Sequence, residues 1–167
     1  MAKGMPSFGQ NEALADSLIQ VYESGNYDPA LKLKILSRIT VYLPDPDRIL
    51  AYSDSLMTEA IRQDSTKYIF NSHLQTGNAL QQKGNLSGAL DSYFKALEIT
   101  DRNTEKKQVA IMYTAIAAVY AGMNNRENVR QYYSDAISIF KTEQDTLNYA
   151  VAIENLGDTY LEWSKPD

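Results

Sequence analysis

Hydrophobic positions recur along this 167-residue chain with the spacing of an α-helix. Phe70, His73, Gly77 and Leu80 follow one another at steps of three and four residues, which places them on one helix face. Helix-breaking residues interrupt the helical stretches at Pro44-Asp45, Gly84-Asn85 and Asn124-Asn125. The pattern predicts pairs of helices, each with a first helix of about 15 residues, a turn and a longer second helix.

These helix pairs repeat with a period of 40 residues. Small residues stand 40 positions apart at Ser37, Gly77, Ala117 and Gly157. A period of this length is typical of helical repeat arrays, in which each unit buries its apolar face against its neighbours. We therefore expect an all-α fold of stacked antiparallel helix hairpins, in which the small residues let helix backbones approach closely.

The chain resembles the tetratricopeptide repeat (TPR) family in one stretch above all. That stretch is Thr76–Leu80, followed by Gly84, Ala89, Tyr93 and Lys95-Ala96-Leu97. The resemblance covers residues 30–167 and implies a right-handed superhelix of antiparallel helix hairpins. A HEAT-like array also has a period near 40 residues and is the alternative.

The period divides the chain into six segments. We expect an expression leader or disordered N-terminus at 1–10, a capping helix at 11–29, TPR-like repeats at 30–69, 70–109 and 110–149, and the first helix of a truncated fourth repeat at 150–167. Residues 7–10 are also compatible with the remnant of a signal-peptide cleavage region.

The net charge and the apolar content of the chain argue against two classes of partner, nucleic acids and membranes. A net charge of -5 and a pI near 4.9 disfavour a phosphate backbone, so we expect no nucleic acid partner. No apolar run approaches the roughly 18 residues of a membrane helix, so we expect no membrane insertion by this segment, although a longer parent protein could be membrane-anchored.

Candidate catalytic chemistry is sparse. The chain has no cysteine and a single histidine, so neither a thiolate zinc site nor a cysteine nucleophile is available. His73 shares a column with Leu33, Tyr113 and Ile153, which we interpret as an interior packing column. We expect no enzyme activity, no cofactor and no metal site.

The TPR resemblance implies a concave groove lined by the first helices, with a protein or peptide segment bound in it. The positions that correspond are Lys34, Arg38, Asn71, Asn78, Gln81, Gln82, Thr114, Ala118, Glu154, Asp158 and Glu162. Such a groove would run from basic through amide to acidic, and its amides could hydrogen-bond a peptide backbone. Two alternatives stay open. In the first, these side chains are only a solvated polar surface. In the second, Glu154, Asp158 and Glu162 form a carboxylate site for Ca²⁺ or Mg²⁺.

One TPR subclass, the co-chaperones that clamp a C-terminal carboxylate, fits poorly. Asn78 matches one position of that clamp, but Leu74, Ile111 and Ala115 stand where basic residues would be needed. We therefore expect a different ligand.

Two stretches also resemble the sensor regions of bacterial membrane adenylate/guanylate cyclases or histidine kinases: Asp16–Leu18 leading into Gly25–Asp28, and Leu80–Leu90. The resemblance implies a non-catalytic scaffold that binds a protein or peptide within a larger signalling protein. It favours the periplasm slightly over the cytoplasm. The alternative function is a free-standing TPR adaptor that assembles a protein complex.

Overall fold

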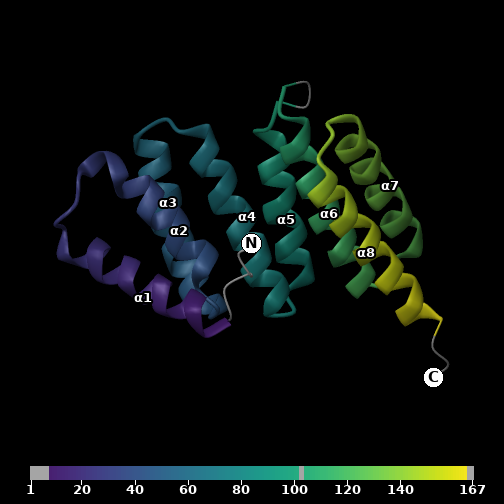
Figure 1. The fold of residues 1–167 in the computed structure, drawn as a ribbon, viewed down its shortest axis with the longest axis horizontal. Helices are drawn as coiled ribbons and strands as arrows, with labels where there is room; N and C mark the ends of the chain where they lie inside the picture. Colours follow the sequence, from purple (N-terminus) through teal and green to yellow (C-terminus); the bar gives the residue numbers. More distant parts are fainter. Residues whose placement is uncertain (1–7, 102–103, 165–167) are drawn as a thin grey trace, which may run out of the picture. The chain divides into compact units, whose positions relative to one another are not determined.

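The computed structural model describes residues 8–101 and 104–164, and all regular structure in these ranges is helical (Figure 1). The α-helices are α1 (Phe8–Ser24), α2 (Lys32–Tyr42), α3 (Pro46–Arg62), α4 (Thr66–Gln82), α5 (Leu86–Glu98), α6 (Lys106–Gly122), α7 (Arg126–Thr142) and α8 (Thr146–Trp163), with a 3-10 turn at Pro29–Leu31. The all-α prediction is confirmed. Of the N-terminal segment predicted at 1–10, residues 1–7 lie outside the described ranges, and α1 already begins at Phe8.

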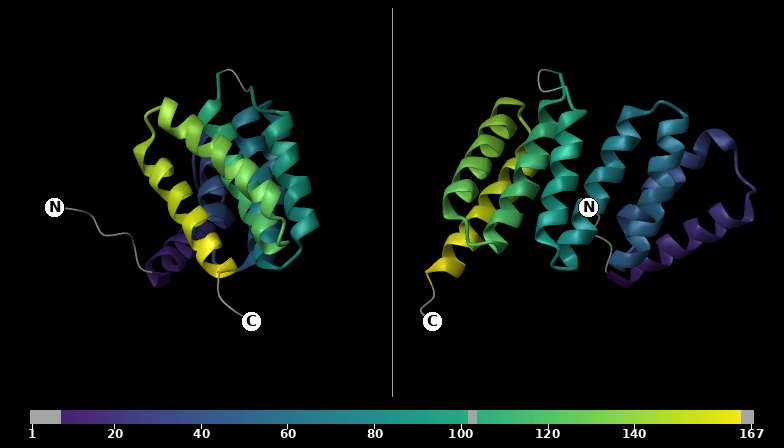
Figure 2. Two further views of the ribbon diagram at one scale, coloured as in Figure 1. Left: turned by 90° about the vertical axis from the view of Figure 1, so that its right-hand side faces the viewer. Right: turned by 180° about the vertical axis from the view of Figure 1, so that it is seen from behind.

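The chain forms two compact units. Unit 1 is Met1–Gly84, with α1 to α4, and unit 2 is Asn85–Asp167, with α5 to α8. Consecutive helices within each unit pack as antiparallel neighbours, as the right-hand view of Figure 2 shows.

The same capping device starts three of the second helices. The side chains of Asp45, Asn85 and Asn125, 40 residues apart, each accept a hydrogen bond from the backbone N–H three residues later, at 2.7, 3.0 and 3.2 Å. Such a bond satisfies one of the amide groups that a helix start leaves unpaired. Gly84 and Asn124 precede two of these caps with φ of 74° and 57°, a left-handed conformation that glycine and asparagine tolerate best.

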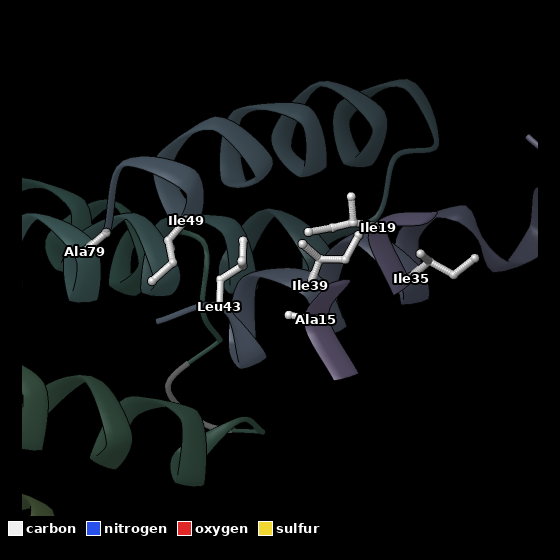
Figure 3. Close-up of a cluster of buried hydrophobic side chains, with 7 residues drawn as sticks. All are labelled: Ala15, Ile19, Ile35, Ile39, Leu43, Ile49 and Ala79. Atoms are coloured by element: carbon white, nitrogen blue, oxygen red, sulfur yellow. The ribbon is translucent and has the colours of Figure 1, made fainter. Parts of the chain in front are cut away.

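Aliphatic side chains fill the core of unit 1. One cluster joins α1, α2, α3 and α4 through Ala15, Ile19, Ile35, Ile39, Leu43, Ile49 and Ala79 (Figure 3). A second cluster lies between α2 and α3, with Leu33, Leu36, Leu56 and Ala60. The α2 and α4 helices also touch each other, so the first helices of successive hairpins lie side by side.

The core of unit 2 combines small residues with large aromatic ones. Phe140 is buried with Ala110, Ala136 and Ala152, and Tyr133 is buried with Ala117 and Val129. Tyr132 stacks on Tyr120 at 5.7 Å between ring centroids. The positions of Tyr120, Tyr132 and Tyr133 are therefore explained by packing within unit 2.

The predicted interior column holds only in part. Leu33 is buried and His73 and Tyr113 are half-buried, but Ile153 is 44% exposed. The buried residue of α8 at this level is Ala152, one position earlier. Among the described helices of unit 2, α8 packs only against α6 and α7, so the side of α8 that carries Ile153 has no neighbour there.

Candidate functional site

The strongest candidate site of unit 1 lies along the seam between α2 and α4. On α4, Asn71, Gln75, Asn78 and Gln82 follow one another at steps of four, three and four residues, so they share one helix face. Asn71 Nδ2 donates a hydrogen bond to Ser37 Oγ of α2 at 3.3 Å. This contact shows that the amide face of α4 borders α2.

A cavity of about 510 Å³ opens between the C-terminal halves of α2 and α4 and the start of α3. Its lining residues are Thr40, Val41, Leu43, Ile49, Gln75, Asn78, Gln81 and Gln82, which we call the amide pocket. Leu43 and Ile49 are only 4% and 3% exposed, so they form an apolar floor beneath the amides. The cavity therefore combines a buried apolar base with a polar rim.

The rim carries hydrogen-bonding capacity without formal charge. Each primary amide offers two N–H donors and a carbonyl acceptor, the same groups that a peptide backbone presents. Asn78 Nδ2 lies 3.4 Å from Gln75 Oε1 and donates to it, which links two amides of the rim. Beside the pocket, an ion pair between Lys83 and Asp47 connects the end of α4 to the first turn of α3.

The predicted site residues of unit 1 fall into two groups. Asn78, Gln81 and Gln82 come together in the amide pocket. The other three are not among its lining residues: Asn71 donates a hydrogen bond to Ser37, and Lys34 and Arg38 are exposed on α2.

Sequence reasoning missed Gln75, although its spacing from Asn71 and Asn78 puts it on their helix face. A comparison of the repeats, position by position, also distinguishes this rim, because the next repeat lacks its amides. Forty residues after Gln75, Asn78 and Gln81, helix α6 has alanine at positions 115, 118 and 121.

The predicted site residues of unit 2 do not gather in the same way. Glu154, Asp158 and Glu162 are exposed on α8, while the Thr114 hydroxyl donates to the Ala110 carbonyl of its own helix at 3.0 Å. Within the described ranges, no three His, Cys, Asp or Glu side chains gather as a metal site would need. A groove that includes these four residues stays a prediction.

A second polar cluster of unit 1 surrounds Glu59, whose side chain is 7% exposed. Hydrogen bonds from Arg62 and, at 2.6 Å, from Gln63 Nε2 hold the pKa of this carboxyl at about 2, and Lys32 Nζ lies 3.1 Å from Glu59 Oε2. Burial alone would raise the pKa, so the hydrogen bonds outweigh desolvation. Glu59 is thus held ionised by its three partners, as expected of a group that joins helices.

The described helices define a protein of the all-α helical repeat class, and comparison with known proteins agrees. No family model matches the chain. It is 38% identical over 73 residues to the regulatory protein RapK of Bacillus subtilis (strain 168), a match that covers 43% of this chain and 20% of RapK. The chain thus spans about one fifth of the length of this relative.

The fold also resembles a solved structure, that of BtubC (BKLC) from P. vanneervenii. The TM-score is 0.73, with 96% of this chain and 68% of BtubC covered, and the sequences are 16% identical. At this identity the likeness shows the fold alone. No helix in the described ranges has the length and apolar character needed to cross a lipid bilayer.

Proposed function

We propose that the chain is a non-catalytic module that binds an extended peptide or protein segment in the amide pocket. The observation that carries this proposal is the gathering of Gln75, Asn78, Gln81 and Gln82 over the apolar floor of one cavity. Its volume of about 510 Å³ falls within the range of ligand pockets, roughly 300–1,000 Å³.

The chemistry of the pocket suits a peptide backbone. Amide side chains can donate to peptide carbonyls and accept from peptide N–H groups, whatever the side chains of that peptide are. Leu43 and Ile49 offer an apolar base on which one side chain of the peptide would be buried. Lys34 and Arg38, exposed farther along α2, would favour a segment with an acidic side chain at that end.

We further propose that the chain is the sensory or interaction region of a larger bacterial signalling protein, with a cyclase or histidine kinase as its output domain and the periplasm as its location. The name of RapK, a regulatory protein, supports a regulatory role. The free-standing adaptor is the second candidate. A membrane helix and a catalytic domain downstream in the full-length gene would support the first, and further repeats followed by a stop would support the second.

The binding proposal is tested with a random heptapeptide library displayed on phage. Selection is performed on the full chain, with depletion against the double variant Asn78→Ala/Gln82→Ala. Enriched peptides are synthesised, and their affinity is measured by calorimetry. We expect the double variant to bind at least tenfold more weakly, since each lost amide leaves a backbone group of the peptide unpaired.

The matched control is Gln20→Ala, which removes an exposed amide from α1 of the same unit. This variant should bind the selected peptides like the wild type, and circular dichroism should give all three proteins the same helix content. Equal affinity of the wild type and the double variant for every enriched peptide would contradict the assignment of the amide pocket.

A further inference from the structure

A second opening lies in unit 2, in the seam between the start of α7 and the end of α8. Arg126 and Arg130 line it from α7, and Tyr160, Trp163 and Ser164 line it from the other side. Its volume is about 360 Å³. We call it the arginine–aromatic pocket.

The equivalent seam between α5 and α6 has different side chains. Forty residues before Arg126 and Arg130 stand Leu86 and Leu90, both half-buried. There the helices are close, because a Cβ on Gly122 would lie 3.4 Å from Leu86 Cδ1. The α5–α6 seam is thus packed with leucine, whereas the α7–α8 seam has two exposed arginines at the same positions.

The arginines have no ionic partner in the part of the chain that the structure describes. The Arg126 guanidinium lies 5.0 Å from the centroid of the Trp163 ring, a cation–π contact. Tyr160 meets Trp163 edge to face at 5.7 Å. Neither Arg126 nor Arg130 forms an ion pair with a described carboxylate, in a chain whose net charge is -5.

We propose that the arginine–aromatic pocket binds an acidic side chain of a peptide, with an apolar neighbour of that side chain against Tyr160 and Trp163. Arginine presents a planar fork of N–H donors that matches a carboxylate, and Arg126 and Arg130 lie one helical turn apart on the same face of α7. The aromatic rings supply the apolar contact. This site is independent of the amide pocket, because every residue that lines it belongs to unit 2.

Trp163 makes the proposal directly measurable, because it is the only tryptophan of the chain. The probe is the peptide acetyl-Leu-Glu-Leu-amide, titrated into the full chain while tryptophan emission is recorded, with calorimetry as a second readout. We expect saturable binding that weakens with added salt and that is at least tenfold weaker for acetyl-Leu-Gln-Leu-amide.

The variant Arg126→Gln/Arg130→Gln should bind the acidic peptide at least tenfold more weakly. Both side chains are exposed, so the variant is expected to keep its helix content by circular dichroism. The matched control is Lys141→Gln, which removes one exposed positive charge from the last turn of the same helix and should leave binding unchanged.

Four results would overturn the proposal. The first is the absence of binding by both readouts at millimolar peptide. The second is equal affinity for the Glu and Gln peptides, and the third is equal affinity of the wild type and the double variant for the acidic peptide. The fourth is a response to inorganic phosphate as strong as the response to the acidic peptide, because the pocket would then hold a simple anion and the apolar contact would contribute nothing.

Discussion

Unit 1 and unit 2 are built from the same helix hairpins, but each leaves a different seam open. In unit 1 the opening lies between the first helices α2 and α4, and uncharged amides surround an apolar floor. In unit 2 the opening lies between α7 and α8, and two arginines face two aromatic rings. The same backbone unit thus presents two surfaces with different chemistry.

The positions that repeat every 40 residues and those that do not have different roles. The helix caps at Asp45, Asn85 and Asn125 recur because each second helix needs its first amide groups satisfied. Three of the four rim amides of α4 are replaced by alanine in α6 and the fourth, Gln82, by Gly122, while the leucines of the α5–α6 seam are replaced by arginines in α7. Departures from the repeat therefore mark the candidate sites.

The units also differ in their cores, and the largest expected effect tests this difference. Phe140 is 1% exposed and packs among alanines in unit 2, so Phe140→Ala should leave a cavity that its neighbours cannot fill. We expect a loss of about 3–5 kcal/mol in the free energy of unfolding, measured by urea denaturation. Phe94→Ala, at a 36% exposed position of the same unit, should cost clearly less, and equal losses would contradict the packing of α7.

The Glu59 cluster of unit 1 predicts a pH dependence of stability. The folded-state pKa of about 2 lies below the ordinary value of 4.5, so the stabilisation is complete above pH 4.5 and is lost as the pH falls towards 2. Arg62 is 68% exposed, so water screens this ion pair and the contribution at neutral pH is on the order of 1 kcal/mol.

Urea denaturation between pH 7 and pH 3 measures this contribution. Glu59→Gln should be less stable than the wild type at pH 7 and should lose less stability on acidification. Asp91→Asn, which removes a 63% exposed partner of Lys95, is the control and should follow the wild-type profile closely. Parallel profiles of the wild type and Glu59→Gln would refute the ionised, buried state of Glu59.

A smaller change in stability is expected when either of two buried serines at the α3–α4 contact is replaced by alanine, and the two replacements should differ. The Ser72 hydroxyl donates to the Ser53 carbonyl at 2.7 Å, while Ser53 Oγ is buried without a hydrogen-bond partner among the described residues. Thermal unfolding should therefore show Ser72→Ala destabilised by about 1 kcal/mol and Ser53→Ala neutral or slightly stabilised. The reverse order would contradict the hydrogen bond from Ser72 to the Ser53 carbonyl.

The helices were predictable because their determinants are local. Apolar spacing and the turns near Asp45, Asn85 and Asn125 define them, and the 40-residue period indicates how the hairpins stack. The interior column was wrong at Ile153, because periodicity places a residue on a helix face but does not tell whether another helix covers that face.

The sites were less predictable than the helices. The resemblance to the TPR family pointed to Asn78, Gln81 and Gln82, and the structure adds that these amides surround one cavity with an apolar floor. Arg126 and Arg130 were missed because they lie outside the predicted groove. They become candidate site residues only when they are compared with Leu86 and Leu90, the leucines at the same positions of the preceding repeat. Openings between helices depend on three-dimensional packing, which residue spacing alone does not give.

The most direct test of the account follows the backbone and side-chain amide resonances of the ¹⁵N-labelled chain while a library-selected peptide is added. We predict that the resonances of Gln75, Asn78, Gln81 and Gln82, together with backbone amides of α2 and α4, shift in proportion to the bound fraction. The resonances of α6 should stay in place, and those of α8 should stay in place when the selected peptide carries no acidic residue. Shifts confined to unit 2, or binding without any change at these four residues, would contradict the amide pocket as the peptide site.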